Sequence, residues 1–347
     1  MHARPPARGD DGLLGGGVRG VLPLRPRPAR GAAGVSEERP PDFEGAACPV
    51  PLTHRDRIVL GHGGGGRLMS DLIRSVFLPR IGNPTLEIGD DAALPPGLEA
   101  IAPGEAIAVS TDAHVVRPLF FPGGDIGRLA VCGTVNDVAM VGAVPLWLTV
   151  GFILEEGIEV DVLTRIAESM RAAAAEAGVM IVAGDTKVAE RGKVDRLYVS
   201  TTGIGRVPAG RQTSGRFARP GDAVLVSGTL GDHGIAVLAA REELAFETAV
   251  RSDVAPLNRL VEALYAASSE VHVLRDPTRG GLAAALNEIA QASRVAIELE
   301  EAAIPIREEV QAACEILGFD PLQIANEGKL VAILPEEHAE AALAALR

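Results

Sequence analysis

Residues 161–187 read DVLTRIAESMRAAAAEAGVMIVAGDTK, and this stretch indicates the class of fold. Apolar residues recur at helical spacing across 161–177, and Gly178 can end the helix. The run 179–183 is short and apolar, which is typical of a buried strand. A helix that leads into a buried strand predicts an α/β layer. The polar Gly-Asp-Thr-Lys after the strand predicts a ligand-binding loop at its carboxyl end.

The same alternation extends in both directions. Apolar runs predict strands at 106–110, 197–202, 223–227, 295–299 and 330–334. Helical patterns occur at 125–141, after His233, and at 280–294, 307–317 and the C-terminus. Asp125 can cap the first of these helices, and the Pro- and Gly-rich stretch 207–221 is a candidate linker. We therefore predict an α/β (α+β) protein with domains at 55–206 and 207–347.

Residues 1–54 do not resemble a folded domain. Residues 1–34 are dense in Arg, Pro and Gly, with little hydrophobic periodicity. They lack the apolar core and cleavage site of a signal peptide. We expect a disordered extension, and translation from a start near Val35 would be more economical.

Composition narrows the classes of function. The 347 residues carry a formal net charge of −13, which argues against nucleic acid or an anionic membrane as the main partner. The sequence contains no run of about 18 apolar residues, so it predicts no transmembrane helix. The three cysteines, Cys48, Cys132 and Cys314, are widely spaced and odd in number. This pattern favours a reducing, cytoplasmic location without a disulfide framework.

The chain contains thirty Arg and only three Lys, at positions 187, 193 and 329. The excess of Arg, Ala and Gly suggests GC-rich coding, which replaces Lys by Arg wherever the chemistry tolerates it. Lys supplies a compact charge and a proton that Arg does not readily release. Lys187 and Lys329 fall within the motifs below, which favours a chemical role over chance retention.

Residues 61–67, Gly-His-Gly-Gly-Gly-Gly-Arg, precede a helical pattern. Glycines let backbone amides approach phosphate oxygens closely, and Arg67 adds a fixed charge. No Lys-Ser or Lys-Thr follows, so this is not a Walker A loop. On its own the signal is weak, and the stretch fits a simple glycine turn slightly better than a phosphate loop.

Five acidic residues form a second candidate set: Asp90, Asp91, Asp112, Asp137 and Asp185. Carboxylates without His or Cys partners suit Mg²⁺, which prefers oxygen ligands shared with phosphates. Asp137 lies within an apolar helical pattern, where an acid is costly unless it is paired or bound to metal. Capping and turn roles explain any single member as well as metal binding does, but they explain the set less well.

Three further motifs carry candidate chemistry. Gly-Asp-Thr-Lys at 184–187 places Lys187 beside Asp185. Residues 276–281 run into a helix, where Thr278 and Arg279 suit an anion at the helix N-terminus. In Asn-Glu-Gly-Lys at 326–329, Glu327 is a candidate base, and a solvated turn is the alternative.

In this order, the motifs resemble those of the PurM-like superfamily of ATP-dependent amide and carbonyl activators. Four stretches narrow the resemblance to the HypE family: residues 62–67, Pro118-Leu-Phe-Phe-Pro-Gly-Gly-Asp125, 184–188 and 326–329. Residues 132–137 and 227–234 agree, and the similarity runs from about Ile58 to Arg347. It implies a PurM-like two-domain architecture with ATP between the domains and an N-terminal sheet domain that dimerises.

The resemblance also implies a reaction. ATP phosphorylates the oxygen of a cysteine S-carboxamide, a base removes the amide proton, and loss of phosphate leaves the thiocyanate used for the cyanide ligands of NiFe hydrogenases. The resemblance implies that Lys187 and Glu327 transfer protons. It implies that Mg²⁺ is bound by Asp90, Asp91, Asp137 and Asp185. It implies that ATP is bound by His62, Gly63, Gly64, Gly65, Gly66, Arg67, Asp112, Asn136, Thr186 and Arg279.

The implied partners are a second copy of the chain, a HypF-type carbamoyltransferase and a HypC–HypD-type scaffold. HypE chains end in a Pro-Arg-Ile-Cys-like tail whose cysteine carries the carbamoyl group. This sequence ends at Arg347 within a helical pattern, so we expect that the tail is missing from it. Cys132 and Cys314 lie in helical patterns and are expected to be core thiols.

Other functions remain open from the sequence. Thiamine-monophosphate kinase shares the Gly-Asp-Asp and Ser-Thr-Asp patterns, but it does not explain residues 118–125 or 326–329. Selenophosphate synthetase would require a reactive Cys or selenocysteine near the glycine loop, where this chain has none. A nucleotide-binding scaffold that only docks maturation partners is an alternative of a different class.

Overall fold

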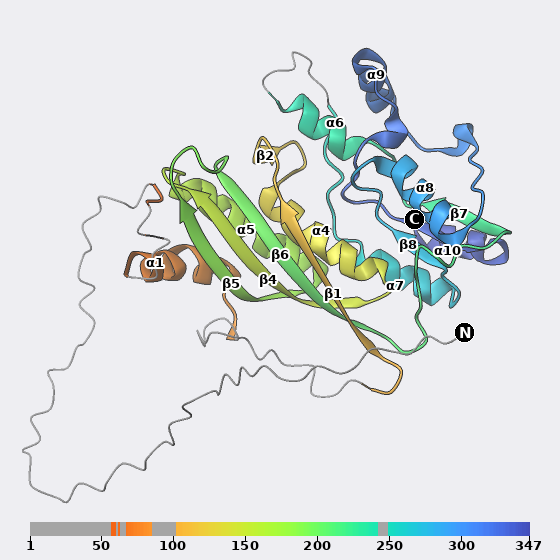
Figure 1. Cartoon of the computed structure of the whole chain (residues 1–347), viewed down its shortest axis with the longest axis horizontal. Helices are drawn as coiled ribbons and strands as arrows, with labels where there is room; N and C mark the ends of the chain where they lie inside the picture. The colour runs from red at the N-terminus through yellow and green to blue at the C-terminus, as the bar shows by residue number, and fades with distance from the viewer. Residues whose placement is uncertain (1–56, 60–61, 63–66, 85–101, 242–248) are drawn as a thin grey trace, which may run out of the picture. The chain divides into compact units, whose positions relative to one another are not determined.

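The structure is a computed structural model, and it describes residues 57–59, 62, 67–84, 102–241 and 249–347 (Figure 1). All of these residues belong to one compact unit, residues 51–347. The extension predicted at 1–54 lies outside the described residues.

A four-stranded sheet with the order β1-β6-β4-β5 forms the first layer. Its strands are β1 (Ala106–His114), β6 (Leu197–Val207), β4 (Val144–Glu155) and β5 (Met180–Ala189). β6 pairs antiparallel with both β1 and β4, whereas β4 and β5 are parallel. A parallel pair requires a crossover, and α5 (Val160–Ala177) provides it.

Helices α4 (Ile126–Met140) and α5 cover one face of this sheet (Figure 1). The approach of α4 to β6 is close, because a Cβ at Gly203 or Gly205 would lie within 2.8 Å of Val138. Leu148 and Ile166 are fully buried between the layers. The opposite face of the sheet is exposed in the described structure and carries apolar side chains, with Val109 65% exposed.

The two helices have the ends that the sequence predicts. Asp125 accepts hydrogen bonds from the backbone N–H groups of Gly127 and Arg128 and so caps α4. Gly178 ends α5 with a φ of 73°, a left-handed conformation that favours glycine.

A second, three-stranded antiparallel sheet has the order β7-β9-β8. Its strands are β7 (Asp222–Val226), β9 (Val331–Pro335) and β8 (Val273–Arg275). The later helices are α6 (Asp232–Ala239), α7 (Asn258–Ala267), α8 (Gly281–Ser293), α9 (Glu308–Leu317) and α10 (Ala339–Ala345).

The shorter elements are α1 (Arg67–Leu72), a π-helix (Ile73–Phe77), α2 (Leu78–Ile81), the pair β2 (Phe120–Phe121) and β3 (Gly124–Asp125), and 3₁₀ turns at Glu301–Ala303, Pro321–Gln323 and Glu336–His338. Within the described residues, no helix has both the length and the apolar character to cross a membrane.

Two predictions about secondary structure were wrong, and one strand was not predicted. Residues 184–187 are not a loop but continue β5, because parallel pairing with β4 extends to Glu155 and Ala189. Residues 295–299 form no strand, since they pair with none of the strands in the described part of the chain. The strand that was not predicted is β4, an inner strand that contains the apolar run Pro-Leu-Trp-Leu-Thr-Val and pairs on both sides.

Candidate active site

Acidic side chains from four separate segments converge beside α4. Asp112 extends from β1, Asp137 from α4, Asp276 follows β8, and Glu327 lies in the turn before β9. Burial, and after it the charges of other members of this group, raise the pKa values of Asp137, Asp276 and Glu327, which places the four carboxyl groups within electrostatic reach. We call these four residues the acidic cluster.

Gly133 on α4 makes room for this cluster. A Cβ at this position would lie 3.7 Å from Oδ2 of Asp112 and 4.0 Å from Oε2 of Glu327. Both carboxylates therefore lie over the same point on the helix. One turn further along α4, Asp137 accepts a 2.9 Å hydrogen bond from the Ser110 hydroxyl.

Burial and neighbouring charges raise pKa values within the cluster. Burial raises the pKa of Glu327 well above its usual range, and the charges of Asp276 and Asp253 raise it further. Burial also raises the pKa of Asp276 to about 6, with a smaller effect from Asp137. Desolvation and like charges both disfavour the ionised carboxyl groups, so a bound cation would be strongly favoured here.

The pKa of Asp137 is raised mainly by burial, against the hydrogen bond from Ser110. The positive charges of Arg275 and Arg279 lower it slightly. Arg279 is exposed just before α8. No three His, Cys, Asp or Glu side chains among the described residues are arranged to hold a metal ion by themselves.

The side-chain amide of Asn136 makes hydrogen bonds to three backbone groups. Its amide donates to the carbonyl oxygens of Ala255 (3.1 Å) and Glu327 (3.3 Å), and its Oδ1 accepts from Leu257 N (2.8 Å). Its side chain is almost fully buried. Asn136 therefore holds the turn that carries Glu327, a role that the sequence analysis did not foresee.

Asp185 and Lys187 lie on the face of the sheet opposite α4, and they form a 2.9 Å ion pair. Their side chains are 60% and 66% exposed, whereas Thr186 between them is buried against the helices. The hydrogen bond from Lys187 lowers the pKa of Asp185. Because β1 and β5 are opposite edges of the sheet, about 14 Å of strand spacing separates this pair from Asp112. A single chain thus does not bring Lys187 to Glu327.

Part of the predicted phosphate loop can be placed. His62 is buried, and its Nδ1 accepts a 3.0 Å hydrogen bond from Val59 N. Gly63, Gly64, Gly65, Gly66, Asp90, Asp91 and the side chain of Arg67 lie outside the described residues.

Two acids that face Glu327 were not predicted as site residues. Asp276 directly follows a strand, a position that could have identified it. Asp253 lies in an irregular segment before α7, where the sequence carries no comparable signal.

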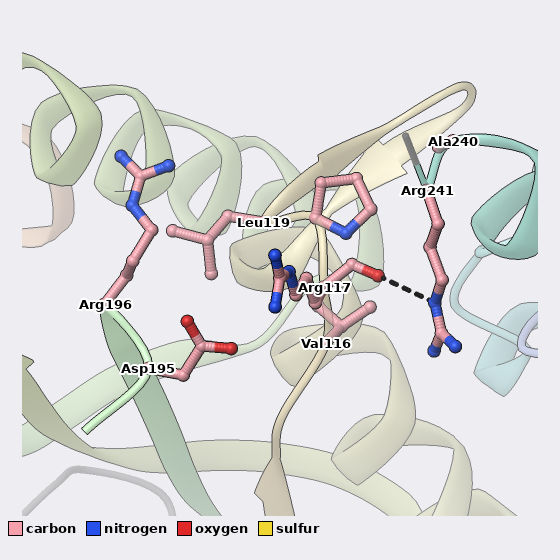
Figure 2. Close-up of a pocket in the computed structure, with 8 residues that line it drawn as sticks. Val116, Arg117, Leu119, Asp195, Arg196, Ala240 and Arg241 are labelled. Atoms are coloured by element: carbon pink, nitrogen blue, oxygen red, sulfur yellow. Dashed lines mark hydrogen bonds between the residues drawn. The ribbon is translucent and has the colours of Figure 1, made fainter. Parts of the chain in front are cut away.

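A separate cavity of about 590 Å³ lies between residues 116–119, 195–196 and 240–241 (Figure 2). Arg117, Arg196 and Arg241 border it, and Arg241 Nε donates to Arg117 O at 3.4 Å. None of the predicted site residues lines this cavity.

Comparison with known proteins identifies the family. The N-terminal domain of AIR synthase related proteins matches residues 89–207, and the C-terminal domain of the same family matches residues 219–347. Carbamoyl dehydratase HypE of Cupriavidus necator is 56% identical over 291 residues, which cover 84% of this chain and 82% of that protein. The chain belongs to the HypE family.

Solved structures of the HypE family agree with this assignment. A HypE crystal structure in complex with ATP is 54% identical, with a TM-score of 0.79 over 83% of this chain and 84% of that chain. A structure of a HypE–HypF complex is 50% identical, with a TM-score of 0.68 over 81% and 88%. The predicted PurM-like α/β fold is confirmed.

Thiamine-monophosphate kinase, the alternative raised by the sequence, is a more distant relative. The enzyme from Stenotrophomonas maltophilia is 26% identical, with a TM-score of 0.55 over 73% of this chain and 81% of that chain. The HypE family therefore accounts for the whole set of motifs better than the kinase does.

Proposed function

We propose that the chain catalyses the ATP-dependent dehydration of a cysteine S-carboxamide to a thiocyanate. The carboxamide oxygen attacks the γ-phosphorus of ATP and releases ADP. Removal of the amide protons and loss of the oxygen as phosphate then leave S–C≡N. The balance is one S-carboxamide and one ATP giving one thiocyanate, ADP and phosphate.

The observation that carries this proposal is the position of Glu327. Its carboxyl group lies beside Asp112 over Gly133, on a turn fixed by Asn136. Burial and, after it, the surrounding acids raise its pKa, as a general base near neutral pH requires. Glu327 is the group proposed to take the amide proton.

The acidic cluster fits a Mg²⁺–nucleotide complex. Its ligands are all carboxylates, and phosphate oxygens would complete a coordination shell that the described residues alone do not provide. Mg²⁺ bound here would neutralise phosphate charge and lower the pKa values of the neighbouring carboxyl groups. Asp137 is the proposed ligand within the cluster, while Asp90 and Asp91 are proposed from the sequence.

The glycine-rich stretch at 63–66, with His62 and Arg67, is proposed to cover the phosphates. Arg279 is proposed to approach them from the start of α8, because its charge already acts on Asp137. These roles rest on the resemblance and on residue type.

A second copy of the chain is proposed to cover the exposed face of the sheet. This face presents Ile107, Val109 and Ile153, which are 44%, 65% and 42% exposed. Asp185 and Lys187 lie on the same face, so a homodimer is an arrangement that can bring Lys187 to the active site of the other copy. Lys187 would then share proton transfer with Glu327, and Asp185 would join the metal ligands.

The remaining partners are proposed from the family. A HypF-type carbamoyltransferase would supply the carbamoyl group, and a HypC–HypD-type scaffold would receive the product. A cytoplasmic location suits this chemistry, and the two cysteines in the described part of the chain, Cys132 and Cys314, are buried free thiols.

The test uses a synthetic peptide that ends in Pro-Arg-Ile and an S-carbamoyl-cysteine. Incubated with the full chain and Mg·ATP, the peptide should lose the mass of one water, with one ADP formed per event. The variant Glu327→Gln should bind ATP and give no thiocyanate. ATP hydrolysis without loss of water from the peptide would refute the proposal.

A further inference from the structure

The buried carboxylate of Asp253 contacts the turn that carries Glu327. Asp253 accepts hydrogen bonds from Glu327 N (3.2 Å, Oδ1) and Gly328 N (3.3 Å, Oδ2). Its Oδ2 also lies 3.2 Å from Nζ of Lys329, and its side chain is only 3% exposed. Three consecutive residues of the turn are therefore held by one carboxylate.

Lys329 occupies a slot shaped for an unbranched side chain. A Cβ at Gly228 would lie 2.8 Å from Cε of Lys329, so this glycine gives the lysine its space. The side chain of Lys329 is 14% exposed. The guanidinium of Arg is wider and planar, so it would place more atoms beside Gly228 than the ammonium does. Position 329 is one of only three lysines in a chain with thirty arginines.

The segment that carries Asp253 is itself fixed. Ser252 N donates to Pro122 O at 2.8 Å, and Arg128 Nε donates to Val254 O at 2.9 Å. The Ser252 hydroxyl accepts from Val254 N, and it lies 2.9 Å from Nδ1 of His233. Asp253 is therefore a rigid support for the turn.

Pairing makes this support neutral. An unpaired carboxylate near Glu327 would add to the negative charge of the acidic cluster and carry a large desolvation cost. The ammonium of Lys329 offsets the charge of Asp253 and contacts the same oxygen that holds Gly328 N. The pair therefore carries no net charge, although the charge of Asp253 still raises the pKa of Glu327.

From these contacts we infer that Asp253 and Lys329 form a clamp that positions Glu327 for proton removal. The inference rests on the proposed role of Glu327 as the base. Both are positioning residues, because they act through the turn at 326–329. A reacting group displaced by about 1 Å loses on the order of 100-fold in rate.

The test compares Asp253→Asn, Lys329→Met and a matched control, Asp222→Asn. The two carboxylate oxygens of Asp253 accept hydrogen bonds from the backbone N–H groups of Glu327 and Gly328. Asparagine would replace one of these oxygens by an NH₂ group, which cannot accept. Asp222 is also a buried carboxylate, which lies 2.8 Å from His272 Nδ1 and accepts from Arg219 N, but it contacts no part of the turn. The readouts are thermal unfolding, ATP affinity by calorimetry, and kcat and KM with the S-carbamoyl peptide.

Asp253→Asn should lower kcat at least tenfold, while the KM for the peptide and the Kd for ATP stay within twofold of wild type. Lys329→Met should lower kcat about threefold or more. Asp222→Asn should keep wild-type kcat even where it lowers the melting temperature as much as Asp253→Asn does.

A kcat within twofold of wild type for Asp253→Asn would overturn the clamp, as would an equal loss in Asp222→Asn. Should Asp253→Asn not fold, a wild-type kcat for Lys329→Met overturns it. These outcomes overturn the clamp but do not contradict the proposed dehydratase function. Absence of turnover by the wild-type chain refutes the proposed function itself and the clamp with it. Full turnover by Glu327→Gln refutes the role of Glu327 as the base, and the clamp with it.

Discussion

Replacing Asn136 by alanine tests how the turn at Glu327 is held. The side chain makes three hydrogen bonds, to Ala255 O, Glu327 O and Leu257 N, at 2.8 to 3.3 Å. It is 1% exposed, so water cannot readily replace the lost contacts. The variant would leave one backbone N–H and two carbonyl groups without their partner.

The magnitude follows from those three contacts. A hydrogen bond contributes about 1 kcal/mol net, and a buried group left unsatisfied costs about 1–3 kcal/mol. Asn136→Ala should therefore reduce the free energy of unfolding by about 3 kcal/mol. In a protein of this size, that loss corresponds to a fall in melting temperature of roughly 5–10 °C.

The assay is urea unfolding followed by circular dichroism, with Asn258→Ala as the control. Asn258 donates one hydrogen bond to Ala177 O at 2.8 Å and does not contact the turn. The control should lose about 1 kcal/mol. ATP affinity of Asn136→Ala should stay within about threefold of wild type, because the wild-type amide is already occupied by backbone groups.

A loss below about 1 kcal/mol would show that Asn136 does not hold these three backbone groups. A tenfold loss of ATP affinity at wild-type stability would instead support a direct contact with ATP, which the family resemblance predicts for this residue. The two roles therefore give opposite results in the same pair of measurements.

Four further outcomes are expected. Asp137→Asn should abolish Mg²⁺-dependent nucleotide binding and leave the fold intact, as checked by calorimetry with and without Mg²⁺. Without nucleotide, the melting temperature should fall as pH rises from about 4 to 6. The reason is that burial raises the pKa of Asp276 to about 6 in the folded state, so folding favours its protonated form. Asp276→Asn should remove much of this pH dependence. Lys187→Arg should keep ATP affinity and lose dehydration of the carbamoyl peptide, and wild-type rates would count against a proton-transfer role. Val109→Asp should convert the proposed homodimer to a monomer in light scattering at micromolar concentration, whereas a wild-type chain that is already monomeric would refute the dimer.

The sequence predicted the helices well where local signals act within a few residues. Asp125 caps α4, and Gly178 ends α5 in a left-handed conformation. Both signals depend on one side chain, or on the lack of one, next to the chain that it affects. They do not require knowledge of what packs against the helix.

The errors occurred where the partner is distant in sequence. Residues 184–187 look like a loop because of Gly184 and the polar residues after it, yet β4 pairs with them and keeps them extended. Residues 295–299 have a strand-like composition but find no strand to pair with in the described structure. A strand forms only when its backbone groups have a partner, and sequence composition does not show whether one is present.

The sequence by itself determined the class of fold, the family and the identity of Glu327 as a candidate base, because these depend on residue type and on order along the chain. Only the tertiary structure showed that Asp112, Asp137, Asp276 and Glu327 converge, and that Asp185 and Lys187 lie on the other face of the sheet. It also showed that Asp253 holds the turn of Glu327 from 74 residues away. Electrostatic and hydrogen-bonding contacts depend on separations of a few ångströms, and folding sets these separations without regard to distance along the chain.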